Sequence, residues 1–152
     1  MQVDHVQADA KLRLAGFIAA NHFLASGELL RRTFNLGHED LLIMLTVGLG
    51  NVQRMLRAPD SEGETASAAL VAQDRIIAMS RRAVARATGL PRETVRRRTN
   101  AMVETGTLLE WGEGLRTARR LVVAPEVRDA IHELLELLAG TCRALQREGI
   151  VV

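Results

Sequence analysis

Arginines supply the chemistry that this sequence offers most clearly, and they crowd one short stretch. Arg92, Arg96, Arg97 and Arg98 stand within seven residues of one another. A guanidinium group is permanently charged, and its fork of N–H donors matches phosphate oxygens and the acceptor edge of guanine. Charges crowded in this way on one helix repel one another. The stretch therefore indicates a partner that accepts positive charge.

Basic charge is concentrated around this stretch rather than spread along the chain. Residues 75–120 hold eleven Arg against four Glu, a net charge of +7, whereas the other residues carry −5 and the whole chain only +2. Nineteen of the twenty basic residues are Arg. This usage suits bidentate binding of phosphates, although a GC-rich genome produces the same bias. The distribution favours nucleic acid as the partner.

Catalytic and metal-binding patterns are missing from the sequence. The four histidines, His5, His22, His38 and His132, are scattered, and none stands at metal spacing from a second type of ligand. There is no glycine-rich phosphate loop and no nucleophile elbow. We therefore expect no enzyme activity, no metal and no cofactor. The single cysteine, Cys142, is expected to be a buried inert thiol, with a redox sensor as the alternative.

Cysteine content and hydropathy also predict a location. One cysteine cannot form an internal disulfide, which suits a reducing cytoplasm. The N-terminus lacks the basic-then-apolar pattern of a signal peptide. The longest apolar run, residues 41–45, is far shorter than the roughly 20 residues that span a bilayer. We expect a cytoplasmic protein that has no membrane partner.

Two helices joined by a tight turn are expected to position the arginines, over residues 80–106. Ser80 can cap the first helix, and Gly89 can adopt the left-handed conformation that ends it. Pro91 is tolerated at a helix start, so it marks where the second helix begins. Gly106 is expected to end that second helix.

The N-terminal part of the second helix carries the candidate contacts to a nucleic acid. Arg92, Arg96 and Asn100 recur at four-residue steps and therefore share one face. Arg can pair bidentately with guanine, and Asn with adenine. Candidates for base contacts are Arg92, Thr94 and Arg96, whereas Arg97 and Asn100 are candidates for either a base or a phosphate.

Three neighbouring residues have structural interpretations. Arg98 is expected to face partly inward and to pair with Glu104 or another acid. Glu93 is expected to pair with Arg97, because the two are four residues apart. Trp111 is expected to fill the core, with stacking on a base as the alternative.

A hairpin with a basic tip is expected to follow the two helices. Residues 107–111 form its first strand, a Gly-Glu-Gly turn covers 112–114, and residues 121–123 form the returning strand. Residues 75–79 are a candidate for a further short strand. Candidates for contacts with phosphates or the minor groove are Arg116, Arg119 and Arg120 near the tip. Arg81 and Arg82, at the start of the first helix, are candidates for contacts with phosphates.

Long apolar helices are expected on both sides of this segment. Residues 8–34 form a dimer arm or a cover over the domain, with a kink or split at Ser26-Gly27 left open. Residues 38–57 are apolar around most of the helix circumference, so we expect this helix to be buried. Residues 125–148 carry a narrow apolar seam with 4-3-4 spacing, which indicates a partner helix.

The passage GLPRETVRRRTNAMVETGTL resembles the turn, recognition helix and strand of winged helix-turn-helix bacterial transcription regulators. Ala85, Gly89 and Val95 stand at the small, turn and buried positions of that motif. The resemblance covers residues 75–123, and the flanking helices are similar in layout to those of MarR-type dimers.

This sequence departs from the family pattern in two places. Arg98 and Thr99 stand where the family usually has apolar residues. The sequence GEGLRTARR replaces the acidic and basic wing signature of MarR-type proteins.

The resemblance implies a fold that is mostly α with a small β-hairpin wing. The expected parts are an N-terminal helical region (1–65), a winged helix-turn-helix domain (66–124) and a C-terminal helix (125–152). The implied function is a sequence-specific, double-stranded DNA-binding transcriptional regulator that acts as a homodimer. The alternative is a winged-helix protein-interaction module without sequence-specific DNA binding.

A small apolar effector is a further hypothesis. Its pocket would lie where the first two long helices are apolar but carry glycines, and a packed core without a cavity is the alternative. The candidate lining residues are Phe17, Phe23, Met44, Gly48 and Leu49.

Overall fold

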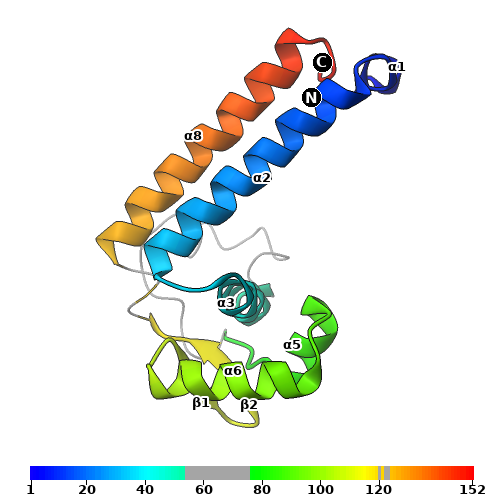
Figure 1. Cartoon of the computed structure of the whole chain (residues 1–152). Helices are drawn as coiled ribbons and strands as arrows, with labels where there is room; N and C mark the ends of the chain where they lie inside the picture. The colour runs from blue at the N-terminus through cyan, green and yellow to red at the C-terminus, as the bar shows by residue number, and fades with distance from the viewer. Residues whose placement is uncertain (54–75, 120, 122–123) are drawn as a thin grey trace. The chain divides into compact units, whose positions relative to one another are not determined.

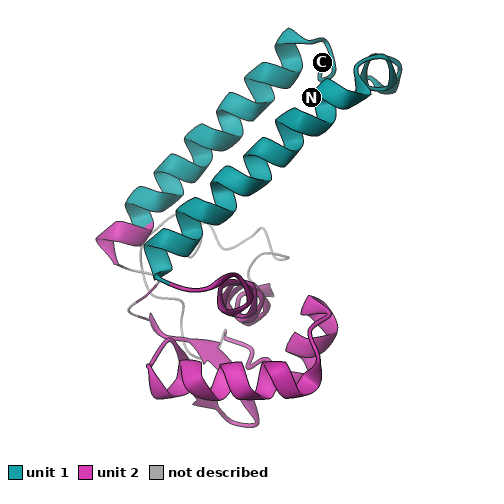
Figure 2. Ribbon diagram, in the orientation of Figure 1, with its two compact units in different colours: residues 1–35, 128–152 teal, residues 36–127 magenta. Residues whose placement is uncertain are grey.

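The computed structural model describes residues 1–53, 76–119, 121 and 124–152 (Figure 1). These residues are mostly helical and include a two-stranded antiparallel sheet, so the coarse prediction of a helical fold with a small hairpin is confirmed. They form two compact units (Figure 2). Unit 1 comprises residues 1–35 and 128–152, and unit 2 comprises residues 36–127. The expected domain boundaries at 65 and 124 differ from the limits of these two units, and the division into three parts stays a prediction.

Unit 1 is built from helices α1 (His5–Ala10), α2 (Leu12–Phe34) and most of α8 (Pro125–Arg147), and α2 and α8 lie side by side (Figure 1). The expected first helix is therefore divided, but at Lys11 rather than at Ser26-Gly27. Helix α2 runs without a break until Asn35, which adopts a left-handed conformation with a φ of 50°.

Within unit 1, polar contacts join the N-terminal and C-terminal segments of the chain. Val3 and Val151 form an antiparallel bridge, and the ammonium group of Lys11 lies 3.1 Å from a carboxylate oxygen of Glu148. Farther along, Nδ1 of His22 lies 3.1 Å from the hydroxyl oxygen of Thr141. That hydroxyl already donates its proton to the Leu137 carbonyl at 2.9 Å, so His22 must be the donor.

Unit 2 contains α3 (His38–Asn51), α5 (Arg81–Thr88), α6 (Arg92–Glu104), β1 (Leu108–Trp111) and β2 (Gly114–Thr117). Helix α3 packs against α5, α6 and β2. The core of unit 2 contains seven fully buried side chains, which come from all five elements: Ile43, Val47, Val84, Val95, Thr99, Leu108 and Leu115.

Helix α3 is not buried on all sides, contrary to the sequence-based expectation. Leu41 and Val47 are buried, whereas Leu42 and Leu49 are exposed. Its apolar residues exceed what one packing stripe can cover, so some of them face outward. The described helix ends at Asn51, and residues 54–57 of the expected helix lie outside the described residues.

The hairpin is shorter than expected, and its tip is not basic. Trp111 pairs with Gly114, so the loop consists of Gly112 and Glu113 alone. Gly112 has a φ of 56°, and glycine with positive φ is favoured at the first loop position of a type II′ hairpin turn. The strand that pairs with β1 is therefore 114–117; of the strand predicted at 121–123, Leu121 is helical and residues 122 and 123 lie outside the described residues.

A buried asparagine holds the hairpin to the end of α3. The amide nitrogen of Asn51 donates to the carbonyls of Ile77, at 2.7 Å, and Leu115, at 3.0 Å. Its amide oxygen accepts the backbone N–H of Thr117 at 3.0 Å. Met79 also bridges to Leu115, so part of the short strand expected at 75–79 lies beside β2. One polar side chain thus satisfies the backbone of two separate segments.

Candidate nucleic-acid interface

The pair of helices α5 and α6 forms as the sequence predicts. The hydroxyl of Ser80 accepts the backbone N–H of Ala83 at 3.2 Å and caps α5. Gly89 ends that helix in a left-handed conformation with a φ of 72°, and its N–H donates to the Ala85 carbonyl. Pro91 stands immediately before α6. These local features hold the arginines of both helices in place.

Arg81 binds inside the protein rather than pointing freely to solvent. Its Nε donates to the Thr99 hydroxyl at 3.0 Å. Its Nη2 donates to the Asn100 amide oxygen at 3.0 Å and to a Glu110 carboxylate oxygen at 2.9 Å. The predicted phosphate contact Arg81 therefore connects α5, α6 and β1. The predicted contact Asn100 has its amide oxygen occupied, although bidentate pairing with adenine needs that oxygen.

Thr99 shows why a polar residue can occupy a position where an apolar one was expected. Its side chain is fully buried. Its hydroxyl accepts from Arg81 and donates to the Arg96 carbonyl at 3.1 Å. Because this buried hydroxyl both accepts and donates a hydrogen bond, it avoids the free-energy cost of an unsatisfied polar group.

Arg98 is a structural residue, as expected, but its partners differ from the one named. It contacts Glu39, and its Nη1 lies 3.1 Å from Oδ1 of Asp40, rather than pairing with Glu104. The hydrogen bond that Arg98 donates to Asp40, helped by the charges of both acids, raises the pKa of the Arg98 guanidinium above its ordinary value. This contact joins α6 to the first turn of α3.

Arg96 is exposed and forms an ion pair with a neighbouring carboxylate. Its Nη2 and Nε lie 2.6 and 2.9 Å from the two carboxylate oxygens of Glu93. The expected pairing of Glu93 with Arg97 is therefore wrong, because the three-residue spacing to Arg96 allows a bidentate fork. The hydrogen bond from Arg96 lowers the pKa of Glu93. Arg96 can contact a base or a phosphate only by exchanging this carboxylate.

Four exposed arginines have no such partner. Within the part of the chain that the structure describes, none of them makes an ion pair, in contrast to Arg81, Arg96 and Arg98. These exposed residues are Arg82 and Arg86 on α5, and Arg92 and Arg97 on α6. Thr94, the remaining base candidate, is half-buried. The surface of α5 and α6 therefore carries positive charge that the described residues do not neutralise.

The hairpin side chains differ from their expected arrangement. Arg116 lies within β2, with its guanidinium carbon 4.2 Å from the centre of the Trp111 ring, a cation–π contact. Trp111 is exposed at the sheet, so the expectation of a core position is wrong.

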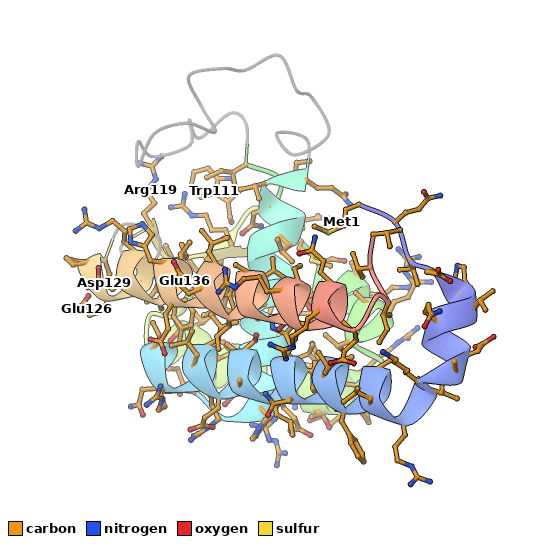
Figure 3. All side chains as sticks on the ribbon, turned by 90° about the horizontal axis from the view of Figure 1, so that it is seen from above. Met1, Trp111, Arg119, Glu126, Asp129 and Glu136 are labelled. Carbon is orange, nitrogen blue, oxygen red and sulfur yellow. The ribbon has the colours of Figure 1, made fainter. Side chains whose placement is uncertain are left out.

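The other two predicted wing arginines lie beyond the hairpin. Arg119 follows β2 and is half-buried (Figure 3). Arg120 lies outside the described residues. Neither Arg116 nor Arg119 lies at the hairpin tip, where they were expected.

The five residues of the predicted effector pocket divide between the two units. Phe17 and Phe23 are exposed on α2, whereas Met44 is buried in the core of unit 2. Gly48 faces Thr117, and Leu49 is exposed. That pocket stays a prediction.

One of these residues does line a groove inside unit 1. The groove has a volume of about 550 Å³ and lies between α2 and α8. Phe17 and Leu137 contribute to its apolar part, and Glu136 is among its polar residues (Figure 3).

The described residues hold no group of metal-ligating side chains and no helix long and apolar enough to cross a membrane. Cys142 is half-buried on α8. Compared with known proteins, the chain matches no protein-family model, no curated protein and no solved structure.

Sequence reasoning missed Asn51 and Arg86. Asn51 carried one local signal, a polar amide at the end of a strongly apolar helix, but its partners lie 26 to 66 residues away. Arg86 was not among the predicted contacts. The structure distinguishes it from Arg81, Arg96 and Arg98, because those three pair with acids and Arg86 has no ion-pair partner among the described residues.

Proposed function

We propose that this chain is a winged helix-turn-helix transcriptional regulator that binds double-stranded DNA sequence-specifically as a homodimer. The observation that carries the proposal is the set of exposed, unpaired arginines on α5 and α6, beside a framework that holds both helices rigidly. An α-helix fits the major groove of DNA, and the residues near its N-terminus reach the base edges.

The geometry divides the candidate DNA contacts by role. Arg92 and Arg97 are free to bind, and Arg92 stands at the first position of α6. Arg96 contacts DNA after releasing Glu93, which is an exposed and therefore weak pair. Arg81 and Asn100 position α6 rather than contacting the operator. Arg82 lies at the start of α5 and contacts a phosphate.

Dimer formation is supported by the apolar surface of unit 1. Leu12, Phe23 and Leu24 are exposed on α2, and Leu135 and Leu138 are exposed on α8. Exposed apolar residues are normal when they are single, but several on neighbouring helices indicate an interaction surface. A second copy of the chain would bury them and would place two α6 helices against one palindromic site.

Selection of bound duplexes from a random pool tests the proposal, followed by affinity measurements over a range of salt concentrations. We expect a palindromic preference, and an affinity that falls steeply with salt. Arg92→Ala should weaken binding and relax the preference at one position. Arg147→Ala removes an exposed charge from unit 1 and serves as the control. Absence of duplex binding at low salt would reject the proposal.

The alternative, a protein-interaction module, is favoured by the same exposed apolar residues of unit 1. In that case the apolar surface would bind a different protein, and the arginines would bind its acidic residues. The salt-dependent selection separates the two functions, because an interaction module recovers no preferred duplex sequence.

A further inference from the structure

A notch lies between α5 and the start of α6, and neither the sequence prediction nor the proposed function uses it as a site. Its volume is about 390 Å³. Six residues line it: Arg82, Ala85, Arg86, Leu90, Pro91 and Arg92. Three of the six are arginines, and they come from both helices of the pair.

The three guanidinium groups concentrate positive charge around the notch. Arg82, Arg86 and Arg92 make no ion pair with the described residues. Arg82 and Arg86 stand four residues apart on α5, a spacing at which like charges destabilise a helix. The folded protein therefore holds these groups together at a cost that a bound anion would offset.

The start of α6 adds to this field. Pro91 precedes the helix, and no side chain caps its first N–H groups. Uncapped N–H groups and the helix dipole both favour an anion near a helix N-terminus. Glu93 lies in this first turn, but its carboxylate is held by Arg96 and it does not line the notch.

The other lining residues restrict what can enter. Ala85 is buried, and Leu90 and Pro91 carry no charge, so the arginines supply every charged contact in the notch. Guanidinium forks bind the oxygens of a phosphate group bidentately. Hydrogen bonds to a phosphate carry no sequence information, but they fix the orientation of a protein on the duplex.

We propose that the notch binds one phosphate of the DNA backbone, with Arg86 as a phosphate contact alongside Arg82, while Arg92 adds positive charge to the notch and keeps its role as a base contact. The inference rests on the proposed function and extends it to a specific place on the DNA strand. Holding a phosphate at the start of α6 sets the depth and angle at which the helix enters the major groove. Arg86 is then a positioning residue that acts equally on every sequence.

The test measures duplex affinity of the full chain against salt concentration, for the selected sequence and for a scrambled one. We expect Arg86→Ala to weaken both duplexes about tenfold, as the loss of a charged hydrogen bond implies. The salt slope should fall by about one unit. Arg86→Lys keeps the charge without the fork and should lose less. Arg147→Ala should change neither quantity, and thermal melting confirms that each variant is folded.

Three other outcomes would overturn the inference in different ways. If Arg92→Ala weakens binding but Arg86→Ala changes neither affinity nor slope, the notch is wrong and the proposed function stands. If the wild-type chain binds no duplex, both fail. The melting temperature of the protein in inorganic phosphate, compared with that in chloride at equal ionic strength, tests whether the notch binds a free phosphate ion. Stabilisation that Arg86→Ala abolishes, without any effect of this variant on duplex affinity, would assign the notch to a free phosphate instead.

Discussion

The two units of this chain treat their apolar residues in opposite ways. In unit 2, Ile43, Val84 and Leu115 are fully buried beneath three helices and a hairpin. In unit 1, Phe17 is 66% exposed and Phe23 is 76% exposed. A domain that encloses its core can be stable by itself, whereas a helix pair buries only the stripe along which the two helices meet. Among the described residues, unit 2 encloses a core of buried side chains, whereas unit 1 exposes apolar side chains that the proposed dimer would bury.

The two units also differ in the kind of surface that they leave without a partner among the described residues. Unit 2 leaves positive charge unpaired on α5 and α6, and unit 1 leaves apolar area uncovered on α2 and α8. Charge attracts a polyanion from a distance, whereas apolar area favours a stable contact between proteins. The contrast predicts that DNA contacts and dimer contacts can be removed separately.

The strongest test of the completeness of unit 2 is the variant Asn51→Leu. The Ile77 carbonyl and the Thr117 N–H would lose the hydrogen bond from or to Asn51, and the Leu115 carbonyl would keep only the N–H of Met79. Unsatisfied buried groups cost about 1–3 kcal/mol each. We therefore expect the free energy of unfolding to fall by about 3–5 kcal/mol, measured by urea denaturation.

The matched control for that variant is Gln53→Leu, which changes an exposed residue just beyond the same helix. We expect it to alter stability by less than about 0.5 kcal/mol. If Asn51→Leu were equally mild, the hairpin would not depend on α3 for its position, and unit 2 would not be the closed domain described above.

The apolar surface of unit 1 is tested by Phe23→Glu. A large exposed apolar residue at the centre of a dimer contact should contribute about 2 kcal/mol, so the dimer dissociation constant should rise about thirtyfold. Sedimentation equilibrium measures this constant, and circular dichroism should show unchanged helix content because Phe23 has little contact within the monomer.

Leu49→Glu is the control that compares the two units directly. Leu49 is 61% exposed but belongs to α3 in unit 2. It should leave the dimer unaffected. Dissociation caused by Leu49→Glu but not by Phe23→Glu would move the interface to unit 2 and reverse the comparison.

Features that depend on neighbouring residues in the chain could be predicted from the sequence. Ser80, Gly89 and Pro91 determine where α5 ends and α6 begins, because capping and φ preferences act within a few residues. The helical fold class and the small hairpin follow from similar local patterns.

Features that depend on distant partners could not be predicted. Arg81 meets Glu110 across 29 residues, so its framework role has no local signal. The structural role of Arg98 was predicted, but its partner Asp40 lies 58 residues away and could not be named. Charge alone made Arg81 and Arg92 look equivalent. Which arginines remain free for a partner is decided by which acids the fold brings beside the others.

A smaller effect is expected from Arg98→Met, which removes the contact between α6 and the start of α3. Asp40 and Glu39 would then face each other without their cation. Because the guanidinium is about one-third exposed, we expect only a small fall in the free energy of unfolding, well below that of Asn51→Leu, in urea denaturation. Arg97→Met, which changes an adjacent exposed arginine, should alter stability by less than half of that. Equal effects of the two variants would show that α6 does not depend on α3 through this pair.

The smallest expected effect on stability comes from the exposed ion pair of Glu93 and Arg96. The pKa of Glu93 in this pair also shows whether Arg96 contacts DNA. Because the Arg96 hydrogen bond lowers the pKa of Glu93 in the folded state, the pair stabilises the protein above the unfolded-state pKa of about 4.3. This contribution is lost as the pH falls through the lower, folded-state pKa. Titration of the Glu93 carboxyl carbon by NMR measures that value, and Arg96→Gln should raise it.

The same titration in the presence of a bound duplex shows whether Arg96 changes partner. If Arg96 releases Glu93 to contact DNA, the pKa of Glu93 loses its largest lowering influence and rises, and the nearby phosphates raise it further. A Glu93 pKa that stays low in the complex would assign Arg96, like Arg81 and Arg98, to the framework of unit 2. The free charge of that unit would then belong to the arginines that have no carboxylate beside them.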